Sequence, residues 1–167
     1  MSTFTTITEK EIFIKMVLSN WELQISRMNN LLGKLSDEEL SAHTAPGRNT
    51  GVYLLGHLAA VSDGMCTFLG LGERLNPEMD EVFLRNPENS GLEKPSIAEL
   101  KDYWNKVNAL LAQKINEIHT DEWFTRHTAV SEEDFAKEPH RNKLNIVINR
   151  TNHLSYHLGQ LAYLAVK

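Results

Sequence analysis

Four long segments of this 167-residue chain repeat apolar side chains every three or four residues, and this periodicity restricts the fold more than any other feature. Side chains spaced in this way share one face of an α-helix, so the pattern predicts four amphipathic helices. Their expected bounds are Thr8 to Gly33, Thr50 to Leu69, Ser96 to Ile118 and Asn142 to Val166. The alternation of apolar and polar residues that is typical of half-buried strands does not occur. We therefore expect an all-α fold.

The connections between these segments indicate how the helices are joined. Residues 71–95 contain Pro77, Pro87 and Pro95 and show no sustained period, as expected for a long crossover between helices two and three. Residues 121–140 are a second irregular connection, with one short helical turn expected at 132–137. Four long helices within the length of one domain predict a four-helix bundle that occupies residues 1–167.

The composition and the local patterns exclude several classes of function. The net charge is −5 and no basic cluster occurs, whereas nucleic-acid binding requires clustered Lys and Arg. The most apolar stretch, Val52 to Val61, is too short to span a bilayer, and the first residues lack the features of a signal peptide. Cys66 is the single cysteine, so no disulfide framework is expected. These features predict a cytoplasmic protein without nucleic-acid or membrane partners.

Two histidines are spaced four residues apart in the last predicted helix. His153 and His157 therefore project from the same face, about 6 Å apart along the helix axis, and can bind one metal ion. His57 lies inside the strongly apolar second helix, and packed helices about 8–10 Å apart allow an imidazole to reach across. We predict that the three histidines form one metal site, because neighbouring imidazoles would be costly to bury without a metal ion or an acid.

The predicted site has no evident fourth protein ligand. The last helix carries no Asp or Glu. By helical geometry Cys66 should point away from His57, and Asp63 should lie about 120° from the direction of that histidine. Three protein ligands would leave coordination positions for water or substrate, as in catalytic zinc sites.

Other polar residues are candidates for supporting roles. Gln160, three residues after His157, is expected to orient a ligand or a bound water, and Asn149 and Arg150 lie near the same helix face. Surface positions are expected for the remaining histidines, which are His43, His119, His127 and His140. Core positions are expected for Trp21, Trp104 and Trp123. These patterns assign no catalytic residue.

Two groups of residues resemble a known family. Leu54-Leu55-Gly56-His57-Leu58-Ala59 and His153-x-x-x-His157-x-Gly159-Gln160 are similar to motifs of the DinB/YfiT-like superfamily of metalloproteins. The segment from Leu35 to Leu40 before a Pro-Gly turn is similar as well, so the resemblance covers nearly the whole chain. It implies a four-helix bundle with a long crossover. It also implies a metal triad consisting of His57, His153 and His157.

The resemblance implies a divalent metal ion, with nickel, zinc or iron typical of the family, and a homodimer. It further implies one of two activities: transfer of a low-molecular-weight thiol such as bacillithiol or mycothiol to an electrophile, or metal-dependent hydrolysis. Each requires an ion that lowers the pKa of a bound thiol or water. Because no acid is evident to accept a proton from water, we expect the transferase. Arg48 and Arg150 are then candidates to bind a carboxylate of the thiol.

Three alternatives to the transferase stay open at this point. The first is the metal-dependent hydrolase. The second is a non-catalytic metal-binding module with a role in stress responses, and the third is a helical domain without a metal ion.

Overall fold

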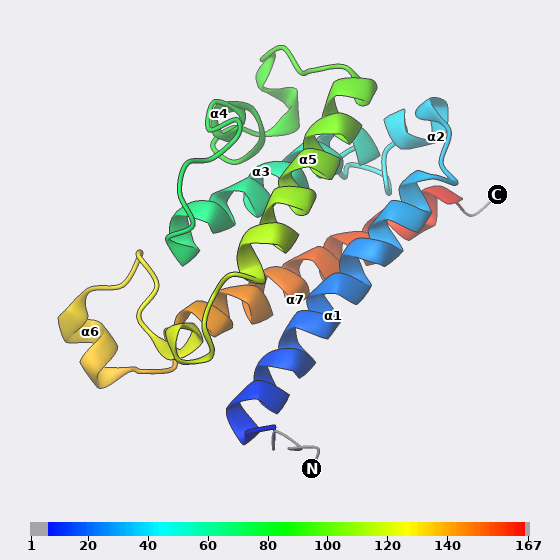
Figure 1. Cartoon of the computed structure of the whole chain (residues 1–167). Helices are drawn as coiled ribbons and strands as arrows, with labels where there is room; N and C mark the ends of the chain where they lie inside the picture. The colour runs from blue at the N-terminus through cyan, green and yellow to red at the C-terminus, as the bar shows by residue number, and fades with distance from the viewer. Residues whose placement is uncertain (1–6, 166–167) are drawn as a thin grey trace.

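The computed structural model describes residues 7–165, and all of the regular elements in that range are helices (Figure 1). Four helices are long: α1 Glu9–Leu32, α3 Gly51–Leu69, α5 Ile97–Ile115 and α7 Lys143–Ala162. The short ones are α2 Asp37–Ser41, α4 Met79–Phe83, η1 Glu88–Ser90, η2 Thr120–Phe124, α6 Glu132–Lys137 and η3 Tyr163–Ala165. The prediction of an all-α fold is thus confirmed for the described part of the chain.

The long helices α1 and α5 begin near the predicted positions, and side-chain caps stabilise both starts. At α1, the Thr8 hydroxyl accepts a hydrogen bond from the backbone N–H of Glu11, and the Glu11 carboxylate accepts one from the backbone N–H of Thr8. Ser96 and Glu99 form the same reciprocal cap at α5. These caps satisfy backbone donors that a helix start otherwise leaves without partners. The local sequence therefore sets where these helices begin.

The predicted helix ends agree less closely with the structure. α3 ends at Leu69, as predicted, and is capped by Gly70, where φ is +70°. This left-handed conformation suits glycine and stops the helix. α5 ends at Ile115, three residues before the predicted Ile118. The predicted end of the last helix, Val166, lies outside the described residues.

The long helices form two pairs, α1 with α7 and α3 with α5, and the two helices of each pair run in the same direction (Figure 1). α3 contacts α5, α1 runs along α7, and α3 also contacts α7 (Figure 1). The two helices that carry the three predicted metal ligands are therefore neighbours.

A buried carboxylate fixes the connection between α3 and α5. Asp63 of α3 accepts hydrogen bonds from the backbone N–H groups of Leu75 and Asn76, at 2.9 and 3.0 Å, and from the Tyr103 hydroxyl at 2.9 Å. The Nε atom of Arg74 lies 3.5 Å from the same carboxylate. These partners replace the hydration that Asp63 loses on complete burial. The connection then returns over α3 as α4.

The buried apolar residues form one cluster, and it includes all three tryptophans that were expected in the core. α3 contributes most to the apolar character of this cluster. Over Gly51–Leu69 it is long and apolar enough to cross a membrane by length and composition, which extends the predicted stretch from Val52 to Val61. Most of this helix is buried inside the fold. Its apolar side chains are therefore used for packing, which is consistent with a soluble protein.

Candidate metal centre

The connection that crosses α3 holds the ring of His57 in place. The ring Nδ1 atom donates a hydrogen bond to the main-chain carbonyl oxygen of Phe83, 2.9 Å away. Phe83 can approach this closely because Gly56 has no side chain: a Cβ added there would lie 2.3 Å from the Phe83 ring. Since Nδ1 of His57 carries the proton, its Nε2 atom presents a lone pair towards α7.

The other two predicted ligands lie one turn apart on α7. The Nδ1 atom of His157 donates a hydrogen bond to Oε1 of Gln160, 2.7 Å away. This bond fixes the ring orientation of His157 and leaves its Nε2 atom without a proton. The Nε2 atoms of His157 and His153 face each other across 3.0 Å. Gln160 thus contacts a predicted ligand in the way that its spacing suggests.

The three imidazoles converge on one point. The Nε2 atom of His153 lies 3.2 Å from Nε2 of His57 and 3.0 Å from Nε2 of His157. The rings meet edge to face, and all the candidate ligand atoms lie within 4.8 Å of one another. Nitrogen atoms that are each about 2.0–2.1 Å from one ion lie roughly 3 Å from each other. The observed spacing therefore suits three ligands of a single ion.

The hydrogen bonds of the rings also favour a cation at this point. The Nδ1 atom of His153 is buried and has no hydrogen-bond partner in the described structure. If Nδ1 of His153 carries the proton, the Nε2 lone pairs of all three histidines face one another. If Nε2 of His153 carries it instead, that proton can form a hydrogen bond with only one of the two neighbouring imidazoles. A divalent cation would accept all three lone pairs. The donor set fits zinc, nickel or iron, each of which binds imidazole.

The surroundings keep two of the imidazoles neutral. Burial lowers the pKa of His153 to about 4, with further contributions from His157, His57 and the positive charge of Arg150. Burial also lowers the pKa of His157, and the hydrogen bond that His157 donates to Gln160 opposes part of that change. A neutral imidazole is the form that binds metal ions, so at neutral pH neither ring must lose a proton to become a ligand.

The three histidines are the one group of metal-binding side chains that the structure brings together within residues 7–165. Cys66 is buried, and burial together with Asp63 raises the pKa of its thiol. Asp63 itself is bonded to the connection between α3 and α5. Both residues therefore lie outside the triad, as the helical geometry predicts.

The other two residues that were expected near the triad differ in position. Arg150 is half-buried on α7, and its guanidinium carbon lies 5.4 Å from the ring centroid of Phe68 on α3. Asn149 is exposed and makes no hydrogen bond to the triad in the described structure. Arg150 thus packs against α3, whereas Asn149 lies on the exposed side of α7.

The prediction of surface positions holds for three of the four remaining histidines: His43, His119 and His140 are exposed. It is wrong for His127, which is only 8% exposed. Its Nδ1 atom accepts a hydrogen bond from the backbone N–H of Ala129. Burial and the nearby Arg141 and Arg126 lower the pKa of His127. This histidine is a packed, neutral side chain in a connection that has no helical periodicity to indicate its burial.

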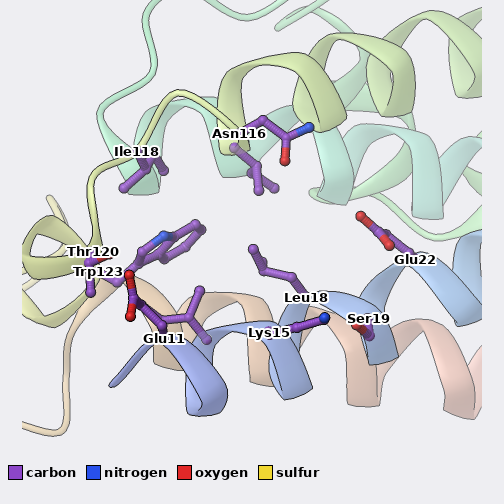
Figure 2. Close-up of a pocket in the computed structure, with 11 residues that line it drawn as sticks. Glu11, Lys15, Leu18, Ser19, Glu22, Asn116, Ile118, Thr120 and Trp123 are labelled. Carbon is purple, nitrogen blue, oxygen red and sulfur yellow. The ribbon is translucent and has the colours of Figure 1, made fainter. Parts of the chain in front are cut away.

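Two cavities lie away from the triad, on the side of the molecule where α1 faces α5. One of about 360 Å³ is bordered by Lys15 and Glu22 of α1 and by Asn116, Ile118 and Trp123 across from them (Figure 2). Its lining offers two carboxylates from α1 and no histidine. The volume of this cavity gives no indication of chemistry, whereas the small three-histidine site has a defined set of donors.

Comparison with models of protein families shows which family the chain matches. The family model described as the DinB superfamily matches residues 20–161, which include all three histidines. No curated protein matches the chain.

Proposed function

The chain belongs to the DinB superfamily, and on this basis we propose that it is a metal-dependent transferase that joins a low-molecular-weight thiol to an electrophile. The observation that carries the proposal is the convergence of three Nε2 atoms, from His57, His153 and His157, within ligand distance of one point. A divalent ion held there would lower the pKa of a thiol that ligates it and make the sulfur nucleophilic near neutral pH.

The side chains around the triad favour a thiol over water as the activated group. Hydrolysis usually requires a carboxylate or another base to handle the proton of the attacking water. Asp63, the acid nearest along α3, is already bonded to two backbone N–H groups and to Tyr103. A thiol can release its proton to solvent, and its sulfur then needs no protein base. The hydrolase is therefore the less supported alternative.

The wider arrangement also fits this family. The four long helices and the connection over residues 71–95 support a four-helix bundle with a crossover between its second and third helices. The single buried cysteine and the packed α3 support a cytoplasmic location.

A homodimer is the proposed assembly. The outer face of α1 exposes Phe13 and Met16, which are 47% and 64% exposed, and Tyr156 on the neighbouring α7 is 66% exposed. An apolar surface of this kind favours association with a second copy. Sedimentation of the purified protein should give the mass of a dimer, and Met16→Glu should shift it towards the monomer.

Metal content is the first test of the proposed function. Protein purified without a nickel column should contain one divalent ion per chain by elemental analysis. His153→Ala should lose that ion, whereas Asn152→Ala, a change at the exposed neighbouring position, should retain it. A metal-free but folded wild-type protein that takes up no nickel, zinc or iron on titration would contradict the proposal.

Thiol transfer is the second test. A monohalobimane and a panel of small thiols should give metal-dependent conjugation with the wild type and none with His153→Ala. If the loaded protein conjugates no thiol, transferase activity is excluded. Retained partner binding by His153→Ala would then favour the non-catalytic module.

A further inference from the structure

Arg150 is a half-buried cation for which the fold supplies no counter-ion. Its Nε atom is buried and without a hydrogen-bond partner, and no residue between 7 and 165 forms an ion pair with its guanidinium group. Burial lowers the pKa of this side chain, which means that the charge is partly removed from water. The chain has 22 acidic residues and only 17 basic ones. Removing this charge from water without a partner is costly, and an anion from outside the chain could pair with the guanidinium group.

The position of Arg150 places it beside the triad. It precedes His153 by three residues on α7, and residues with this spacing lie on the same helix face. Its guanidinium group extends to the ring of Phe68 on α3. Arg150 thus lies between α3 and α7, the two helices that supply the histidines.

Gly64 leaves space on the face of α3 that carries His57 and Phe68. These residues are eleven apart, about three helical turns, and so lie on one face. Gly64 lies between them, and a Cβ added there would meet only the Phe68 ring, at 3.8 Å. A small molecule bound at the triad would therefore find no side chain of residue 64 between it and Arg150.

We propose that Arg150 binds a carboxylate of the thiol used by the triad and thereby selects acidic thiols over neutral ones. This inference rests on the function proposed above. The planar guanidinium group can donate two parallel hydrogen bonds to a carboxylate, and its half-buried position strengthens such a pair relative to one on the surface. The stacking on Phe68 holds the group in place for this contact.

The test uses protein loaded with Co²⁺, because the visible spectrum of this ion reports both metal binding and thiol ligation. The loaded wild type is titrated with mercapto-carboxylic acids of increasing chain length, each compared with the neutral mercapto-alcohol of the same length. Where the chain length matches the separation between the ion and Arg150, the acid should bind about tenfold more tightly, as expected for one charge-assisted pair.

Three variants isolate the charge of Arg150. Arg150→Met keeps an apolar side chain against Phe68 and should lose the preference for the acid while binding the alcohol as before. Arg150→Lys should retain part of the preference, because it keeps the charge and loses the paired donors. Arg27→Met, a change at an exposed position of α1, should leave the preference unchanged.

Two outcomes separate this inference from the proposed function. Loaded wild type that ligates thiols with no preference for the acid at any length, or Arg150→Met that keeps the preference, would overturn the role of Arg150 alone. Protein that binds no Co²⁺, or whose Co²⁺ spectrum no thiol changes, would overturn the proposed function and the role of Arg150 with it.

Discussion

The carbonyl oxygen of Phe83 lies 2.9 Å from Nδ1 of His57, and this hydrogen bond joins residues that are 26 positions apart. Through this bond α4, which is part of the connection between α3 and α5, fixes the ring orientation of His57, a candidate metal ligand. The bond depends on Gly56, since any larger residue there would displace the Phe83 ring. Packing of the connection and metal affinity should therefore change together.

Gly56→Ala tests this coupling. The added Cβ would lie 2.3 Å from the Phe83 ring, so we expect a loss of about 1–3 kcal/mol in the free energy of unfolding from overpacking. We also expect weaker zinc binding, because the carbonyl that orients His57 moves with the ring. Urea denaturation and competition with a chromogenic chelator would measure the two effects. Gly64→Ala is the matched control: its Cβ has space, and it should stabilise α3 by about 0.5–1 kcal/mol.

Gln160→Leu should weaken metal binding without unfolding the protein. The change removes the acceptor that holds the Nδ1 proton of His157, and loss of such an orienting partner typically costs 10–100-fold in metal affinity. The same chelator competition gives the affinity, and circular dichroism would verify the helix content. Gln160→Glu retains an acceptor oxygen and should bind at least as tightly as the wild type. Equal affinities for all three proteins would show that the hydrogen bond has no orienting role.

Acidification should release the metal ion, because protons compete for the imidazole lone pairs. The pKa of His153 is lowered to about 4, so this ring stays neutral well below the usual value near 6.5. We expect full occupancy at pH 7 and progressive release between about pH 6 and pH 4, reversed when the solution is neutralised. Elemental analysis after rapid desalting at each pH measures the occupancy. Release above pH 7 would be inconsistent with histidine ligands in this setting.

Asp63→Asn should destabilise the metal-free protein by about 1–3 kcal/mol. An amide cannot accept all of the hydrogen bonds that Leu75, Asn76 and Tyr103 donate to this carboxylate, and buried donors would lose their partners. Urea denaturation at neutral pH gives the change. Tyr103→Phe removes one of the donors rather than the shared acceptor, so the loss of this hydrogen bond should cost less, about 1 kcal/mol. A larger loss for Tyr103→Phe than for Asp63→Asn would contradict the importance assigned to the carboxylate.

Features that depend on neighbouring residues could be predicted from the sequence. The capping box of Thr8 and Glu11 requires only residues three apart, and the shared face of His153 and His157 follows from the helical repeat. The contact between Gln160 and His157 has the same local origin. The all-α fold follows from four such periodic segments.

Features that depend on the path of a connection could not be predicted in this way. The bond between Phe83 and His57 involves a main-chain carbonyl, which any residue supplies, so the side-chain pattern holds no signal for it. A glycine at position 56 does not identify the segment that packs against it, which is Phe83 of α4. The burial of His127 likewise depends on how residues 121–140 fold back, and this segment has no period to show it.

The histidines of the triad lie far apart in sequence: His57 and His153 are separated by 96 residues. An ion shared by both would bind only the folded chain, since the unfolded chain would have to close a loop of that length to hold it. The concentration of the metal ion would then affect how long the protein survives in the cell as well as its reactivity. Cells short of the ion would hold a looser form that proteases remove sooner, so the amount of protein would follow the availability of its metal.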